Sequence, residues 1–118
     1  MSIDPSALTP YRNVMGADAD SFVADLIDSF LANSGELVAG IDSALANNDA
    51  ERFARSAHTL KSNSAVFGAH VLSAFCQELE LAGKGGELDG LQDKIDQLKA
   101  EYKQVCQELA DLRRTLPG

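Results

Sequence analysis

The feature that most constrains the fold is the spacing of apolar residues near the C-terminus. Large apolar side chains recur there at alternating intervals of four and three residues, at positions 91, 95, 98, 102, 105, 109, 112 and 116. This spacing places one stripe along an α-helix and favours packing against neighbouring helices at a shallow angle. No stretch alternates apolar and polar residues for long enough to predict a strand.

Four further segments are predicted to be helical. A short one begins with Thr9 as N-cap and ends at Gly16. The second follows Asp18 to about residue 45, through a weak point at 33–35, and the third runs from Asn48 or Asp49 to about 68 or 69. The fourth carries apolar residues from 72 to 82 and ends at the glycine-rich turn 83–86. The sequence therefore predicts an all-α, antiparallel four-helix bundle with a short extra N-terminal helix, as one domain over 1–118.

Charge and cysteine content exclude several classes of function. The net charge is −8, so phosphate backbones and anionic lipid surfaces repel the chain, and we expect no nucleic-acid or membrane contact. Cys76 and Cys106 lie in apolar helical stretches without a CxxC motif, which indicates reduced thiols. We see no signal peptide and no apolar run long enough to span a membrane.

One histidine lies on the outer side of the third predicted helix. The core stripe of that helix consists of residues 53, 57, 60, 64 and 67, and His58 points about 140° away from the start of the stripe. Its helical neighbours are mostly small, and Lys61 lies one turn later. A neutral imidazole is a good nucleophile near pH 7, and Lys61 can offset an added negative charge. The only other histidine, His70, is predicted to face solvent without a role.

The residues around His58 resemble a known signature. Segment 57–69 reads AHTLKSNSAVFGA, and it is followed by Leu72 and by CQELE at 76–80. This pattern resembles the histidine-containing phosphotransfer (HPt) domain family of two-component phosphorelays, over nearly the whole chain. The resemblance implies that His58 accepts a phosphoryl group from the aspartate of a receiver domain and passes it to another receiver.

The resemblance also implies roles for other residues. Lys61 supports the phosphorylated state, and Gly68 lets the third and fourth helices pack closely. Glu80, at a site that is often Gln, can reach the imidazole, either by accepting from its other nitrogen or by pairing with Lys61. Ser62 departs from the family, in which Gly is common at this position. Ser is small and can donate a hydrogen bond, so we expect the function to be retained.

A receiver must approach the imidazole closely, so its docking face should surround His58. The predicted face consists of Ala54, Arg55, Thr59, Ser62 and Ala65. The short N-terminal helix, with Tyr11 and Met15, is a candidate source of additional apolar contacts. The far part of the last helix, from Val105 onward, should not take part.

The expected partners are receiver domains of response regulators, a hybrid histidine kinase, or both. The chain has no P-loop and no metal-ligand spacing, so we expect a phosphocarrier without kinase activity or intrinsic cofactor, with Mg²⁺ supplied by the receiver. We expect a monomer in the cytoplasm, either alone or as the cytoplasmic part of a larger membrane-bound kinase.

Two alternatives remain at this level. One is a purely structural helical bundle that dimerises through the stripe of its last helix. The other is the HPt-like domain of a chemotaxis-type kinase, which takes its phosphate from a kinase domain. Phosphate on His58 in the presence of a phosphorylated receiver separates the phosphocarrier from the structural bundle.

Overall fold

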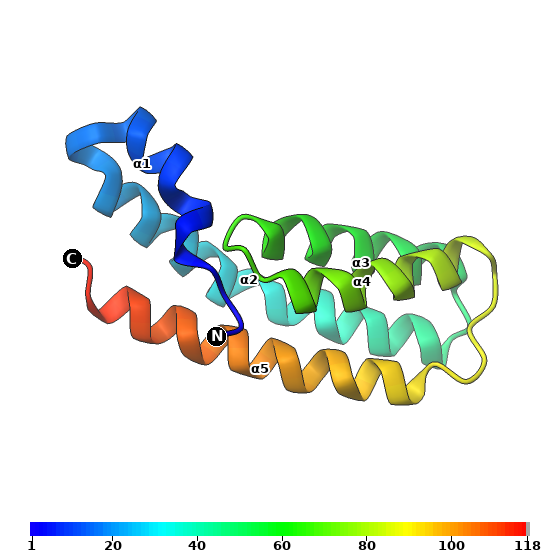
Figure 1. Ribbon diagram of the computed structural model, residues 1–118. Coiled ribbons are helices and arrows are strands. Elements are labelled where there is room, and N and C mark those ends of the chain that lie inside the picture. Colours follow the sequence, from blue (N-terminus) through cyan, green and yellow to red (C-terminus); the bar gives the residue numbers. More distant parts are fainter. Residues whose placement is uncertain (118) are drawn as a thin grey trace.

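The predicted apolar stripes form helices that pack against one another. The computed structural model describes residues 1–117 and contains no strand among them. Its elements are η1 (Pro5–Leu8), α1 (Thr9–Met15), η2 (Gly16–Asp18), α2 (Ala19–Ala46), α3 (Ala50–Ala65), α4 (His70–Lys84) and α5 (Gln92–Arg114). Helices α2 to α5 form the antiparallel bundle, and α1 packs beside the start of α2 (Figure 1). The predicted fold class is therefore confirmed.

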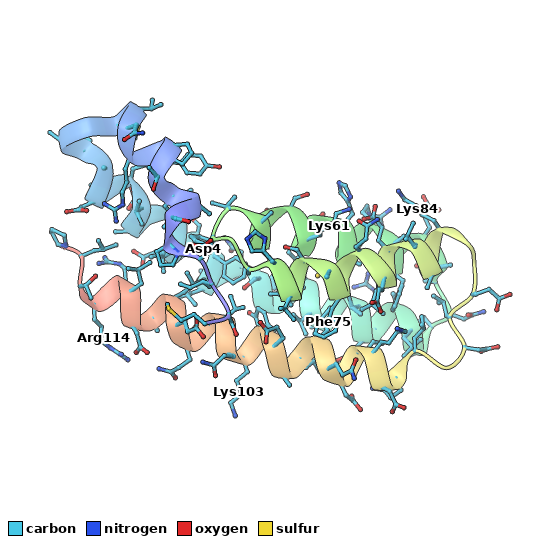
Figure 2. All side chains as sticks on the ribbon, in the orientation of Figure 1. Asp4, Lys61, Phe75, Lys84, Lys103 and Arg114 are labelled. Atoms are coloured by element: carbon cyan, nitrogen blue, oxygen red, sulfur yellow. The ribbon has the colours of Figure 1, made fainter. Side chains whose placement is uncertain are left out.

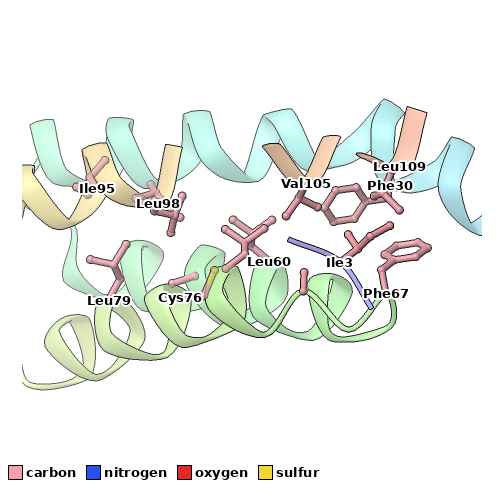
Figure 3. Packing of buried hydrophobic residues seen from close by; sticks show 14 of the residues in the cluster. Ile3, Phe30, Leu60, Phe67, Cys76, Leu79, Ile95, Leu98, Val105 and Leu109 are labelled. Atoms are coloured by element: carbon pink, nitrogen blue, oxygen red, sulfur yellow. The ribbon is translucent and has the colours of Figure 1, made fainter. Parts of the chain in front are cut away.

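The core lies between the apolar stripes of the four long helices. Figure 3 shows Leu79, Cys76 and Leu60 facing Ile95, Leu98 and Val105 of α5. The α5 residues Ile95, Leu98, Val105 and Leu109 are at most 1% exposed. This part of the α5 stripe is buried within its own bundle, so it is not free to form a dimer in the way that the structural alternative requires.

The predicted weak point of α2 remains helical. Ser34 is buried there, and its hydroxyl donates to the carbonyl of Phe30 and makes a 2.7 Å hydrogen bond with the Tyr102 hydroxyl. Because this polar group is satisfied inside the protein, it carries no penalty for burial, and the helix continues to Ala46.

The N-terminal segment ties two parts of the bundle together. The backbone N–H groups of Ser2 and Ile3 donate to the carboxylate of Glu108 on α5, at 2.9 and 3.0 Å. The next N–H, of Asp4, donates to the carbonyl of Phe67 in the α3–α4 loop at 2.9 Å. Asp4 also caps η1, so the first helical turn begins earlier than the predicted cap at Thr9.

The predicted role of Gly68 was wrong. Helix α3 ends at Ala65, and Gly68 lies in the following loop with a φ of 65°, a conformation that favours glycine. A Cβ there would stand 2.7 Å from the Asp4 Cβ and 2.8 Å from the Asp4 carbonyl oxygen. Gly68 therefore lets the N-terminal segment close over the loop, rather than letting α3 and α4 approach each other.

The glycine at the α3–α4 contact is Gly83. A Cβ at this position would stand 2.9 Å from both the Cβ and the backbone nitrogen of Ala54. Helices α3 and α4 can therefore pack this closely only because Gly83 has no side chain and Ala54 has a small one.

Both cysteines are free thiols, with Cys76 in the core and Cys106 half-buried. Burial raises the pKa of the Cys76 thiol to about 12, so it is not a nucleophile near neutral pH. None of the helices within residues 1–117 is both long enough and apolar enough to cross a bilayer.

Candidate functional site

The imidazole of His58 stands on the outer surface of α3. Asp49 caps this helix by accepting a hydrogen bond from the Arg52 N–H at 3.1 Å, and this bond stabilises the first helical turn. The His58 side chain is 57% exposed, and its Nδ1 lies 2.9 Å from Oε2 of Glu80 on α4. The predicted position of His58 on the outer flank is confirmed.

Glu80 is a carboxylate enclosed by donors. Its side chain is only 4% exposed, with Lys61 Nζ 2.6 Å from Oε1 and Lys84 Nζ 3.0 Å from Oε2. The Lys61 hydrogen bond is the largest cause that lowers the pKa of Glu80, and it outweighs burial, which acts to raise it. Lys84 and His58 lower it further, to about 2. Glu80 is therefore ionised throughout the neutral range.

The charge of Glu80 determines the tautomer of His58. An ionised carboxylate only accepts hydrogen bonds, so Nδ1 of His58 must be the donor. In the neutral imidazole the lone pair then lies on Nε2. The arrangement fixes the ring orientation and leaves a nucleophilic nitrogen on an exposed side chain.

Lys61 is held by two residues of α4, Glu80 and Gln77. Its Nζ donates to Oε1 of Gln77 at 2.7 Å, and its side chain is 26% exposed. Figure 2 shows Lys61 and Lys84 along the same edge of the bundle. The sequence allowed two contacts for Glu80, one with the imidazole of His58 and one with Lys61. The structure contains both.

The predicted docking face is only partly exposed. Arg55, Thr59, Ser62 and Ala65 lie on the surface of α3, as expected. Ala54 does not, because it is 8% exposed at the contact with Gly83, and this part of the prediction was wrong. The N-terminal helix α1 lies at the far end of the bundle, where Tyr11 packs beside Phe22 of α2 (Figure 1).

Sequence reasoning missed Lys84 and Gln77, which complete the surroundings of Glu80. Lys84 follows Glu80 by four residues, a spacing that places both on one face of a helix and could have revealed the pair. An open groove of about 730 Å³ begins at His58 and runs between α3 and the end of α4.

Fold and site together define a four-helix bundle that presents one exposed, oriented histidine beside two lysines. The chain belongs to the Hpt domain family, whose model matches residues 25–112.

Individual relatives agree with this assignment. The chain is 33% identical over 79 residues to the sensor protein TorS of Escherichia coli K12. The matched region covers 67% of this chain but only 8% of TorS. The crystal structure of histidine-containing phosphotransfer protein B from Pseudomonas aeruginosa PAO1 is similar, with a TM-score of 0.85 and 28% identity over 98% of this chain and 97% of that one. The Hpt domain of a Shewanella sensor hybrid histidine kinase shares the fold, with a TM-score of 0.80 and 22% identity over 99% and 97% of the two chains.

Proposed function

We propose that this chain is a phosphocarrier that accepts a phosphoryl group on His58 from the aspartate of one receiver domain and passes it to another. The observation that carries the proposal is the hydrogen bond from His58 Nδ1 to the buried carboxylate of Glu80. It leaves Nε2 as the nucleophile on a side chain that a partner can reach. Membership of the Hpt domain family supports the same function.

The transfer itself needs little from this chain beyond position and charge. The Nε2 lone pair attacks phosphorus, the bond between phosphorus and the aspartate oxygen breaks, and the carboxylate leaves with that electron pair. The positive charge that develops on the ring is stabilised by Glu80 through Nδ1–H. In the onward step a carboxylate oxygen of a second aspartate attacks phosphorus, the N–P bond breaks, and its electron pair returns to Nε2.

Two lysines suit the phosphorylated state. Lys61 and Lys84 both contact Glu80, whose negative charge would otherwise repel a phosphoryl group on the neighbouring ring. Either ammonium can also turn toward the phosphoryl oxygens as a point charge. We assign Lys61 and Lys84 to charge compensation and Glu80 to positioning of the ring.

The proposed partners are receiver domains, either of response regulators or within a hybrid histidine kinase. The chain acts as a carrier and not as a kinase, and the receiver supplies the aspartate and its Mg²⁺. The matched relative TorS is a sensor protein about twelve times the length of the matched region, because that region spans 8% of it. We propose that one monomer of this chain meets one receiver at a time.

Replacing the nucleophile tests the proposal. We expect His58→Gln to fold normally, because the side chain is largely exposed, and to take no label from phosphorylated receivers. The wild-type label should be lost in acid and survive in base, as expected for phosphate bound to nitrogen. Labelling is followed by autoradiography and folding by circular dichroism. Persistent labelling of His58→Gln, or an acid-stable label on the wild type, contradicts the proposed function.

A further inference from the structure

We propose that the groove between α3 and the end of α4 is a docking site for an acidic loop of the partner, held by Arg55 and Lys84. The inference rests on the proposed function, because it takes the partner to be a receiver. It places part of the interface on α4 and the following turn, beyond the face predicted on α3.

The shape of the groove suits an inserted segment of polypeptide. Its volume of about 730 Å³ lies within the range of ligand-binding clefts, which is about 300–1,000 Å³. Small residues line it, namely Ala50, Ala54, Gly83 and Gly85. Gly83 and Ala54 are in close contact and close the floor of the groove, and the space above it is open among residues 1–117. A partner backbone can therefore come close to both helices.

The rim of the groove carries two accessible cations. The Arg55 side chain, one turn before His58, is 67% exposed, and that of Lys84 is 65% exposed. Arg55 has only a loose ion pair, 3.9 Å from Glu51, whose side chain is 91% exposed. Arg55 can thus turn toward a new partner at little cost. Lys84 has three N–H donors and can contact a partner without leaving Glu80.

Two acidic residues also line the groove, and they do not cancel this attraction. Three donors already engage the charge of Glu80. Glu51 opposes an acidic partner, but it stands at the far end of the groove from His58, almost two turns back along α3. The rim next to His58 is therefore the more cationic end.

The positive charge beside the groove contrasts with the negative charge of the rest of the molecule. The net charge is −8, and α2 contains acidic residues but no Lys or Arg. Helix α3 has the opposite balance, with Arg52, Arg55 and Lys61 against Glu51 alone. A receiver brings negative charge to His58, because a phosphoryl group carries about −1.5 to −2 charges. An acidic loop beside that phosphoryl group would be repelled by α2 and attracted to the groove side.

Charge reversal in the groove tests the inference. The rate of transfer from a phosphorylated receiver to the full chain is measured as kcat and KM, at about 20 and about 200 mM salt. We expect Arg55→Glu to raise KM at least tenfold at low salt and less at high salt, because screening weakens charge pairs. Lys103→Glu is the matched control, since Lys103 stands on the opposite side of the bundle (Figure 2), and it should stay within twofold of wild type.

A second variant tests the shape rather than the charge. Gly85 has a φ of −79°, and a Cβ there would make only ordinary contacts, at 3.5 Å from the Leu81 carbonyl oxygen. Gly85→Tyr should therefore fold, fill the groove and raise KM at both salt concentrations. If the wild type is labelled and both groove variants transfer with wild-type KM, the groove is not a docking site. If no phosphorylated receiver labels wild-type His58, the proposed function itself fails.

Discussion

At the scale of single residues, the decisive contact is the one between Glu80 and His58. Two lysine ammonium groups and the imidazole surround its carboxylate, which is 4% exposed. A carboxylate accepts hydrogen bonds but cannot donate them, whereas an amide does both. The charge at this position, and not only its size, therefore determines which nitrogen of His58 is free to react.

Glu80→Gln separates these two properties. We expect the variant to remain folded at pH 7, because the amide oxygen still accepts from Lys61. The amide NH2 group then takes the place of Oε2 and cannot accept from Nδ1 of His58. The phosphotransfer rate should fall about 10- to 100-fold, the usual loss when a group that orients a functional histidine is removed. Glu78→Gln is the control, because Glu78 is half-exposed on the same helix and pairs with Lys94 instead. Equal transfer rates in Glu80→Gln and wild type would show that the amide orients the ring as well as the carboxylate does.

The low pKa of Glu80 also predicts a dependence of stability on pH. Its value of about 2 in the folded protein lies below the ordinary value of 4.5. This difference stabilises the fold fully above about pH 4.5, and the contribution is lost as pH falls toward 2. Urea unfolding at pH 7 and pH 3 should show a larger loss of unfolding free energy in the wild type than in Glu80→Gln. Parallel losses in the two proteins would contradict this assignment.

At the scale of helices, the close approach of α3 and α4 determines whether Glu80 reaches His58. The two helices meet where Gly83 lies against Ala54, one turn from both functional side chains. Any side chain at Gly83 would separate the helices on the side that carries the site. The close packing at Gly83 therefore maintains the distance between the His58 imidazole and the Glu80 carboxylate.

Gly83→Ala should consequently destabilise the bundle. Its Cβ would stand 2.9 Å from backbone and side-chain atoms of Ala54, so we expect a loss of about 1–3 kcal/mol in the free energy of unfolding. Gly35→Ala in α2 is the matched control, because its Cβ would stand at an ordinary contact distance of 3.8 Å from the Tyr102 hydroxyl oxygen. That change should stabilise the protein by about 0.5–1 kcal/mol through helix propensity. Urea titrations that give both variants the same sign would refute the predicted contact.

At the scale of the whole molecule, the N-terminal segment joins α5 to the α3–α4 loop. Glu108 accepts two backbone N–H groups from this segment, and Ile3 is buried beside them. Gly68 permits the contact because it has no side chain to meet Asp4. The segment therefore closes the end of the bundle from which α2 and α5 extend beyond the shorter pair of helices (Figure 1).

Glu108→Ala should loosen this closure. We expect faster amide hydrogen exchange at Asp4, whose N–H bonds to Phe67, and a loss of about 1–3 kcal/mol in unfolding free energy. Asp111→Ala, less than one turn further along α5 on an exposed side chain, should leave both quantities near wild type. Unchanged exchange at Asp4 in Glu108→Ala would show that the segment is held by burial of Ile3 alone.

The sequence by itself determined the helices and the outward position of His58. The helical period of about 3.6 residues determines which side of its own helix each residue occupies. The bundle, the continuous α2 and the exposed histidine could therefore all be predicted. The same arithmetic identified Arg55, Thr59, Ser62 and Ala65 as surface residues. These properties depend only on local spacing along one helix.

Only the tertiary structure decided which residues meet across helices. Ala54 is buried because α4 places Gly83 against it, and Gly68 serves the N-terminal segment because α3 ends three residues before it. Likewise, His58 and Lys61 of α3 both reach Glu80 of α4 because the two helices are antiparallel at one particular axial offset. Helical periodicity specifies a direction around an axis, but it does not specify the offset between two axes. That offset follows from how all the side chains of the core pack together.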